Sequence, residues 1–279
     1  MCFGSKKVTN FCAMPPISDL DDKKLLSFLK DHSIGFVIPT RDGELPFWAK
    51  HAKYLKENKI GVMISSIDSI EICEDKLEFG KFFQNSKIPS IQTTLNPGVD
   101  LTGCKSIIVK ERRGSASESI GLNLELTDAI EHAKHLNEPI FQPQITGKEL
   151  SAETWVDQNG NCNGVLLRWR LKVVNGESHE TKIFQNKKWS DMLKETFSKL
   201  KGLRGHVLAQ VIVDNNENLH LIEINPRLGG ASPLALKGGL NSIKWSLWES
   251  NEMFDLIPTT PKIAYGLSLH KQGSQVSIF

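Results

Sequence analysis

Two polar residues, Glu223 and Asn225, interrupt an apolar segment with side chains that are able to bind a metal ion. They are two positions apart, so on a strand both side chains point to the same face. A four-residue loop upstream would pair Asp214 with Leu219 in a hairpin and place Gln210 opposite Glu223. Carboxylate and amide oxygens that converge in this way suit Mg²⁺, which completes its shell with phosphate oxygens and water. The pattern predicts a metal–phosphate site, and the alternative is the solvent-facing polar edge of an ordinary hairpin.

Two lysines and a polar loop could contact the phosphates. Lys76 begins an expected helix, and Lys110 ends the apolar strand expected over 106–110. The segment 112–119 reads RRGSASES, and small residues between positive charges are able to fold backbone N–H groups over a phosphate. The alternatives are lysines whose stems lie on the surface and an ordinary solvated loop.

A third pattern suits the base and sugar of a nucleotide. The apolar strand expected over 139–145 runs into Gly147, and its backbone could meet an adenine edge. Glu149 follows at the place where it could accept hydrogen bonds from ribose hydroxyls. The alternative is an exposed strand, since Glu149, Ser151 and Glu153 share one face.

A fourth pattern is a row of cations in a hairpin. Asn175-Gly176 is a strong turn signal, because a type I′ turn needs positive φ at both positions. The implied register places Lys172 opposite His179 and aligns three cations, Arg168, Arg170 and Lys172, on one face of a strand. This face is either an anion-binding surface or a solvated ladder offset by glutamates, and the pattern leaves both open.

The elements that must position these residues change in character along the chain. Up to residue 74 strands alternate with helices, which indicates a parallel βαβ unit, and Ser18 or Asp19 would cap the first helix. Beyond Gly147 the pattern is mostly antiparallel, and the tail beyond Asn251 carries no motif. The expected helices cover 19–31, 44–58, 75–86, 125–136 and 189–201, and the expected strands cover 34–38, 59–64, 106–110, 139–145, 149–157, 162–174, 206–214 and 219–225.

Composition excludes several classes of protein. The chain has 279 residues, 34 Lys and Arg against 32 Asp and Glu, and 39% hydrophobic residues. A formal charge of +2 argues against a dedicated nucleic-acid binder, and no apolar run is long enough to span a membrane. Five scattered cysteines without a CxxC pair suggest neither a disulfide framework nor a zinc site. Without a secretory signal at the N-terminus, we expect a cytoplasmic protein with reduced thiols.

Taken in order, these segments resemble the ATP-grasp superfamily, most closely the branch of the carbamoyl-phosphate synthase large subunit. The resemblance runs from about residue 73 to 239, and EINPR at 223–227 is its most specific part. It implies an α/β (α+β) protein, with two α+β lobes of the ATP-grasp fold after a partial Rossmann-like parallel α/β unit. The implied boundaries are 1–72 for the partial domain and 73–279 for the ATP-grasp domain, with lobes at about 73–145 and 146–250 and a tail at 251–279.

The resemblance also implies a role for each candidate residue. The phosphate contacts would come from Lys76, Lys110 and the loop of Gly114 and Ser115. The adenine and ribose contacts would come from Gln142, Pro143, Ile145 and Glu149. One or two Mg²⁺ (or Mn²⁺) ions would bind to Gln210, Glu223 and Asn225, while Arg227, with Lys110, would stabilise the transferred phosphoryl group.

The implied activity is that of an ATP- and Mg²⁺-dependent ligase. It would convert a small carboxylate into an acyl phosphate and join it to an amine, so its partners would be small molecules. The glycine-poor loop at 114–119 and the short N-terminal region motivate an alternative, a non-catalytic or split-subunit ATP-binding module. They also motivate the expectation of a homodimer or of a partner subunit that completes the N-terminal domain.

Overall fold

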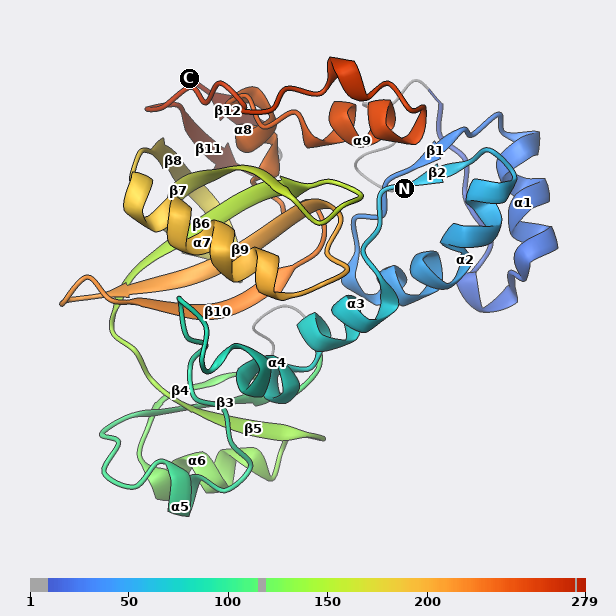
Figure 1. Ribbon diagram of the computed structural model, residues 1–279. Coiled ribbons are helices and arrows are strands. Elements are labelled where there is room, and N and C mark those ends of the chain that lie inside the picture. The colour runs from blue at the N-terminus through green and yellow to red at the C-terminus, as the bar shows by residue number, and fades with distance from the viewer. Residues whose placement is uncertain (1–9, 115–118, 274) are drawn as a thin grey trace.

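The described part of the chain folds into three β-sheets and the helices around them (Figure 1). The structure, a computed structural model, describes residues 10–114, 119–273 and 275–279. The sheets have two, three and seven strands, and they follow one another along the chain. Helix α4 (Lys76–Phe83) lies between the three-stranded sheet, called the small sheet below, and the seven-stranded sheet, called the large sheet (Figure 1). The mixed α+β architecture expected from the sequence is confirmed.

The first sheet belongs to a parallel β-α-β unit. Strands β1 (Phe36–Val37) and β2 (Gly61–Val62) pair in parallel, and α2 (Leu45–Glu57) connects them along the chain. Helix α1 (Asp22–Asp31) packs beside α2, and its N-cap is Asp21, whose carboxylate accepts a hydrogen bond from Lys24 N at 2.9 Å. The expected caps Ser18 and Asp19 are wrong, because 17–19 form the separate 3-10 turn η2 (Ile17–Asp19). Before α4 come η3 (Asp42–Glu44) and α3 (Ile67–Glu74).

The second sheet has the order β4-β3-β5 and one buried face. Its strands are β3 (Ile107–Glu111), β4 (Gly121–Leu124) and β5 (Pro139–Pro143). Ile107, Val109 and Phe141 point to one face and form a core with α6 (Leu126–Ala133), near the short helix α5 (Pro97–Asp100). Because side chains alternate along a strand, Lys110 and Gln142 point to the opposite face.

The third sheet is antiparallel and has the order β10-β9-β6-β7-β8-β11-β12. One of its faces is covered by helix α7 (Lys187–Lys199), whose Leu193 and Phe197 pack on Leu150 and Ala152. The strands are β6 (Gly147–Val156), β7 (Cys162–Val174), β8 (Glu177–Phe184), β9 (Gly205–Asp214), β10 (Leu219–Asn225), β11 (Ser268–Gln272) and β12 (Gln275–Ile278).

The C-terminal segment completes this sheet, although the sequence beyond Asn251 shows no motif. Helices α8 (Ser232–Lys237) and α9 (Ser242–Ser250) pack on Trp155 and Leu166, on the face opposite α7, and η4 (Phe254–Leu256) follows α9. Strand β11 then pairs with β8. The tail is therefore part of the large sheet.

The face of β6 opposite α7 carries polar residues that are deeply buried. Ser151 and Glu153 have 0% exposure, while Glu149 near the strand start keeps 39% of its side chain exposed. The alternative of a plain exposed strand is wrong, because α8 and α9 cover part of this face.

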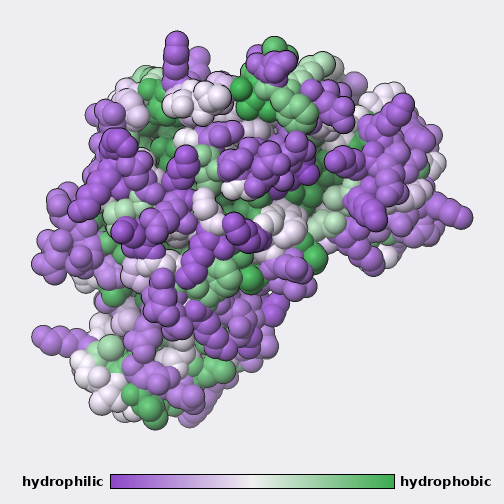
Figure 2. All heavy atoms as spheres, in the orientation of Figure 1, coloured by the Kyte–Doolittle hydropathy of each residue, from purple (hydrophilic) through white to green (hydrophobic). Residues whose placement is uncertain are grey.

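The outer surface is mostly hydrophilic on the side seen in Figure 2, with apolar side chains in small separate patches. Among the described residues, no helix combines the length and the apolar character that a membrane span needs.

Candidate functional site

The three predicted metal ligands lie together at the end of the large sheet. Glu223 on β10 pairs with Gln210 on β9, as the sequence predicts. The carboxylate Oε1 of Glu223 accepts hydrogen bonds from Gln210 Nε2 at 2.8 Å and from Asn225 Nδ2 at 2.7 Å. Both amides use the same carboxylate oxygen, so these bonds leave Glu223 Oε2 and the two amide oxygens for a cation.

The chemistry of this donor set fits Mg²⁺ that is also bound by phosphate. Mg²⁺ takes one or two carboxylates and fills its octahedron with phosphate oxygens and water. Within the described ranges, no group of three or more His, Cys, Asp and Glu side chains is placed to hold a metal ion. A site with one carboxylate and two amides would therefore depend on phosphate oxygens to complete the coordination shell.

Lys110 faces this cluster from the small sheet. Burial lowers the pKa of Lys110 to about 8, while the Glu223 carboxylate acts to raise it and Lys76 lowers it further. Burial also lowers the pKa of Lys76, again against the charge of Glu223. The charge of one carboxylate of the large sheet thus acts on both lysines that are predicted to contact phosphates.

The other nucleotide candidates lie along the small sheet and the connection that leaves it. Gln142 shares a face with Lys110, is buried, and donates from Nε2 to Thr93 Oγ1 at 2.7 Å. Pro143 ends β5, and Ile145 lies in the connection to β6 with its side chain partly buried. The structure thus places Gln142 on the same face of the small sheet as Lys110, with Pro143 and Ile145 following it along the chain.

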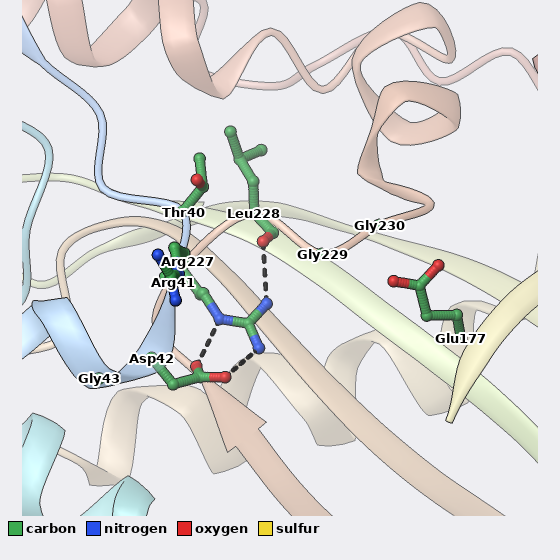
Figure 3. A pocket seen from close by; sticks show the side chains of 9 residues that line it. All are labelled: Thr40, Arg41, Asp42, Gly43, Glu177, Arg227, Leu228, Gly229 and Gly230. Carbon is green, nitrogen blue, oxygen red and sulfur yellow. Dashed lines mark hydrogen bonds and ion pairs between the residues drawn. The ribbon is translucent and has the colours of Figure 1, made fainter. Parts of the chain in front are cut away.

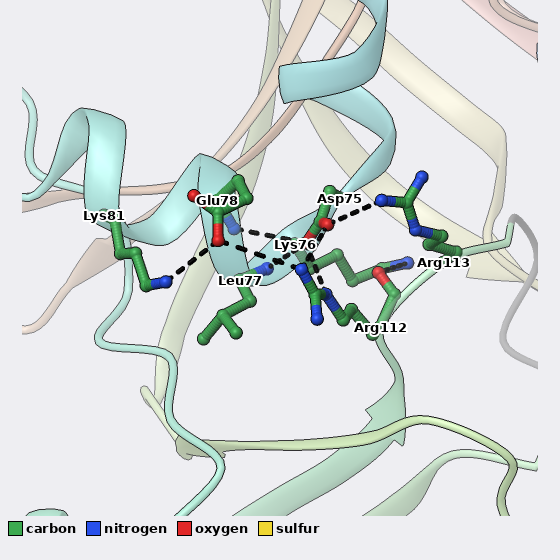
Figure 4. Close-up of polar contacts among 7 residues, drawn as sticks. All are labelled: Asp75, Lys76, Leu77, Glu78, Lys81, Arg112 and Arg113. Atoms are coloured by element: carbon green, nitrogen blue, oxygen red, sulfur yellow. Dashed lines mark hydrogen bonds and ion pairs between the residues drawn. The ribbon is translucent and has the colours of Figure 1, made fainter.

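The polar loop begins in a network of charges around Asp75 (Figure 4). The buried Asp75 carboxylate caps α4 and accepts hydrogen bonds from Arg112 at 2.6 and 2.8 Å and from Arg113 at 2.8 Å. Burial alone would raise the pKa of Asp75, but the two arginines hold it below its usual value. Lys76 Nζ donates to Gly114 O at 2.9 Å, and Ser115 lies outside the described residues. Asp75 therefore fastens the loop to α4, a role that the sequence did not predict.

Glu149 is oriented by one of the three cations of β7. Arg170 Nε donates to Glu149 Oε2 at 2.9 Å, and burial lowers the pKa of Arg170 against the charge of Glu149. Lys172 lies opposite Glu180 instead of His179, because bulges shift the register on both sides of Lys172. The Arg168 and Arg170 side chains are buried and paired with glutamates, so they form no open anion-binding surface. Only the exposed pair of Lys172 with Glu180 resembles the solvated ladder.

Arg168 belongs to a buried network beneath the segment after β10. Its Nε donates to Glu153 Oε1 at 2.5 Å, and Glu153 Oε2 lies 3.0 Å from His206 Nε2. Burial raises the pKa of Glu153, but Arg168 and His206 outweigh it and hold the pKa at about 2. Ser232 Oγ lies 3.3 Å from His206 Nε2 and accepts a hydrogen bond from Gly229 N at 2.8 Å. The network thus supports the backbone that follows Arg227.

We expect Glu153→Ala to lower the free energy of unfolding by about 3–5 kcal/mol, because it leaves the Arg168 guanidinium buried without its counter-charge. Urea denaturation measures this loss. Glu180→Ala is the matched control, since its carboxylate is 41% exposed and lies 3.9 Å from Lys172. Equal stabilities of the two variants would contradict the buried ion pair.

Arg227 lies at the edge of a pocket beside the predicted metal ligands. Its Nε and Nη2 donate to the two carboxylate oxygens of Asp42, and its Nη1 donates to Leu228 O at 3.0 Å (Figure 3). The pocket has a volume of about 460 Å³ and lies between η3, the start of β8 and the segment from Arg227 to Gly230. Asp42 is a site residue that the sequence did not predict.

The Cys73 thiol, which lies beside the site, is poorly suited to chemistry. The structure describes four of the five cysteines, all of them free. Burial raises the pKa of the Cys73 thiol, and the nearby carboxylates of Glu74, Glu223 and Asp42 raise it further. The thiolate that a nucleophile needs is thus strongly disfavoured.

We expect Cys73→Ser and Cys104→Ser to keep ATP-dependent turnover within about twofold of the unmodified chain, because the Cys73 thiolate is disfavoured and Cys104 is an exposed residue outside the predicted site. Steady-state release of ADP measures this. A loss of turnover in the Cys73 variant with unchanged thermal stability would show a role for the thiol.

The same fold occurs in several solved structures. Biotin carboxylase from Campylobacter jejuni, in a β-γ-ATP complex, superposes with a TM-score of 0.72 at 14% identity, over 91% of this chain and 63% of its own. N5-carboxyaminoimidazole synthetase from Staphylococcus aureus, complexed with ADP, superposes with a TM-score of 0.69 at 14% identity, over 90% of this chain and 69% of its own. L-amino acid ligase from Bacillus licheniformis superposes with a TM-score of 0.65 at 16% identity, over 89% of this chain and 64% of its own. The chain thus spans 63% of the length of this biotin carboxylase.

A sequence comparison with family models agrees with the fold. The model of the ATP-grasp domain matches residues 73–231, which is more than half of the chain. This range includes both lysines, the Asp75 network, the predicted metal ligands and Arg227. The chain belongs to the ATP-grasp family.

Proposed function

We propose that the chain is an ATP- and Mg²⁺-dependent ligase that activates a small carboxylate as an acyl phosphate and joins it to an amine. The observation that carries this proposal is the cluster of Glu223, Gln210 and Asn225 on the large sheet, whose carboxylate acts electrostatically on Lys110 of the small sheet and on Lys76 of α4. The fold shared with ATP- and ADP-bound ligases supports it.

Each part of the site has a task in this reaction. Gln142, Pro143 and Ile145 would hold the adenine, Glu149 the ribose, and Lys76, Lys110 and the loop from Gly114 the phosphates. Glu223, with Gln210 and Asn225, would hold Mg²⁺, which neutralises charge on the transferred phosphoryl group when bound.

A carboxylate is a poor electrophile because its charge is delocalised over two oxygens. In the proposed reaction a carboxylate oxygen attacks the γ-phosphorus of ATP, and ADP leaves with the bond electrons. The nitrogen of an amine then attacks the carbonyl carbon of the acyl phosphate, inorganic phosphate leaves, and the nitrogen loses a proton. Phosphoryl transfer needs mainly positioning and charge neutralisation, which the lysines and Arg227 would supply.

Isotope transfer tests the proposed ligase directly. When both oxygens of the carboxylate substrate are ¹⁸O, the released phosphate must contain one ¹⁸O atom, because the attacking oxygen stays with phosphorus when the acyl phosphate breaks. Mass spectrometry of the phosphate, over a panel of carboxylate and amine pairs, measures this. A chain that binds ATP but releases no phosphate with any pair would instead be the non-catalytic or split-subunit module.

We expect the affinity for MgATP to fall above pH 8, by about tenfold between pH 7 and pH 9, because binding needs the charged form of Lys110 and its pKa is about 8. The unfolded chain holds the Lys110 proton up to a higher pH, so the same shift makes stability rise between pH 8 and the ordinary lysine pKa.

Calorimetric titration at both pH values measures the change in affinity. In Lys110→Arg the guanidinium stays charged, so this variant should show a much smaller change with pH. An equal loss of affinity in both proteins would assign the effect to another group.

Two further expectations remain proposals. The first is that the substrate specificity resembles that of the carbamoyl-phosphate synthase branch. The second is that the chain forms a homodimer or binds a partner subunit that completes the N-terminal domain. Light scattering of the purified chain, alone and after co-expression with neighbouring gene products, measures its assembly.

A further inference from the structure

The pocket beside Arg227 is framed by two ion pairs. On one wall Arg227 holds Asp42 through both of its parallel N–H groups, and on the other Lys271 Nζ donates to Glu177 Oε2 at 2.9 Å. Glu177 faces the Arg227–Asp42 pair across Gly229 and Gly230 (Figure 3). Lys271 comes from β11, so the C-terminal tail supplies one of these charges. The volume of about 460 Å³ lies in the range of small-molecule sites, about 300–1,000 Å³.

The first of these ion pairs occupies the groups that a substrate carboxylate would use. A planar guanidinium binds a carboxylate or phosphate best through two parallel N–H bonds, and Asp42 takes both from Arg227. The pair is largely withdrawn from water, with 17% of the Arg227 side chain and 24% of the Asp42 side chain exposed. An incoming anion that displaced Asp42 from Arg227 would leave the Asp42 carboxylate without a partner. The Asp42 carboxylate would then lie beside the negative charge of the anion itself.

The charge of Asp42 also acts on a residue of the proposed phosphate site. The Asp42 carboxylate acts to raise the pKa of Lys76 and of Cys73, and Glu223 acts on both groups in the same direction. Arg227 lies two residues after the end of β10, and its backbone N–H donates to Asn225 O at 2.8 Å, so a molecule bound between Asp42 and Arg227 would lie close to the proposed Mg²⁺ and γ-phosphate site.

We propose that this pocket takes a zwitterionic substrate, an amino acid whose carboxylate binds Arg227 and is phosphorylated while its ammonium group binds Asp42. The proposal rests on the proposed ligase function. A zwitterion exchanges partners with the ion pair, so both protein charges stay matched when it binds. A carboxylate without an amino group satisfies Arg227 alone and repels Asp42.

Hydroxylamine provides a test that does not need the natural amine acceptor. The carboxylate of the substrate attacks the γ-phosphorus, ADP leaves, and the hydroxylamine nitrogen attacks the acyl carbon. Phosphate leaves, the nitrogen loses one proton, and a hydroxamate forms, which ferric ion colours. The assay uses the full chain with MgATP and the common α-amino acids, β-alanine and γ-aminobutyrate. Each is compared with the acid that lacks the amino group, such as alanine with propionate.

The best amino acid should exceed its deaminated partner in kcat/KM by about tenfold to a hundredfold, the effect of one charge-assisted contact. Asp42→Asn, which keeps the shape but removes the charge, should raise KM for the amino acid and bring the two acids within about threefold. Asp42→Glu, which keeps the charge, should retain the preference for the amino acid.

Glu44→Gln is the matched control, because this carboxylate lies on the same 3-10 turn and pairs with Arg41 at 3.4 Å. It should leave the preference unchanged. Deaminated acids that react as well as amino acids, or an unchanged preference in Asp42→Asn, would overturn the inference while the ligase function stands. If MgATP binds by calorimetry but no acid yields a hydroxamate, the ligase function fails and the inference fails with it.

Discussion

Replacing Glu223 by alanine is expected to reduce ATP-dependent turnover by about a hundredfold or more, because it removes the only carboxylate of the proposed Mg²⁺ site and its charge opposite Lys110. The two amides of Gln210 and Asn225 would lose their common acceptor as well. Glu223→Gln keeps a side chain of the same shape and should lose activity to a similar extent, which separates the charge from the packing.

Turnover of Glu223→Ala is measured as release of ADP, with the fold checked by circular dichroism and thermal melting. Glu195→Ala is the control, because Glu195 is exposed on α7, the helix on the opposite face of the large sheet. We expect a folded Glu223 variant that needs far more Mg²⁺, or that is inactive at any concentration. Full activity at ordinary Mg²⁺ would remove Glu223 from the site.

The second large effect is expected for Lys110→Ala, in which the affinity for MgATP falls by about tenfold to a hundredfold. The ammonium is the charge that the small sheet directs towards Glu223, and burial already lowers its pKa to about 8. Because the charged form is disfavoured in the folded chain, its removal should leave the free energy of unfolding unchanged or higher.

Calorimetry and urea denaturation of the same variant test both parts. Lys105→Ala, an exposed residue before β3, is the control and should change neither quantity. A Lys110 variant that loses stability together with affinity would assign this lysine a structural role instead of a phosphate contact.

The sequence predicted correctly that Gln210, Glu223 and Asn225 lie together, because strand geometry is local. A side-chain period of two and a short loop were enough to place Gln210 opposite Glu223. The details of the hairpin differ, since Leu219 pairs with Val213 instead of Asp214. A register shift between Leu221 and Glu223 then restores the predicted pair, so the bulge matters for the site.

Local sequence patterns did not predict the contacts between residues that are far apart in the chain. The bond between Asp42 and Arg227 joins residues 185 positions apart, and it depends on how the first β-α-β unit packs on the large sheet. Asp75 and Arg112 meet for the same kind of reason, across 37 positions. No local spacing identifies such pairs, although the short charged segments on both sides are visible in the sequence.

The C-terminal strands were missed for a different reason. Strand β11 reads SLHKQ, and only Leu269 in it is buried. A strand near the sheet edge with a single buried apolar residue lacks the alternation that predicts a strand. Yet β11 carries Lys271, which holds Glu177 at the pocket.

The most direct test of the site is a crystal structure with Mg²⁺ and a non-hydrolysable ATP analogue. We predict an ion roughly 2.0–2.1 Å from a carboxylate oxygen of Glu223, bound at the same time to phosphate oxygens. Lys110 Nζ should lie within hydrogen-bond distance of those phosphates. A nucleotide bound elsewhere, or an ion that Glu223 does not touch, would contradict the account.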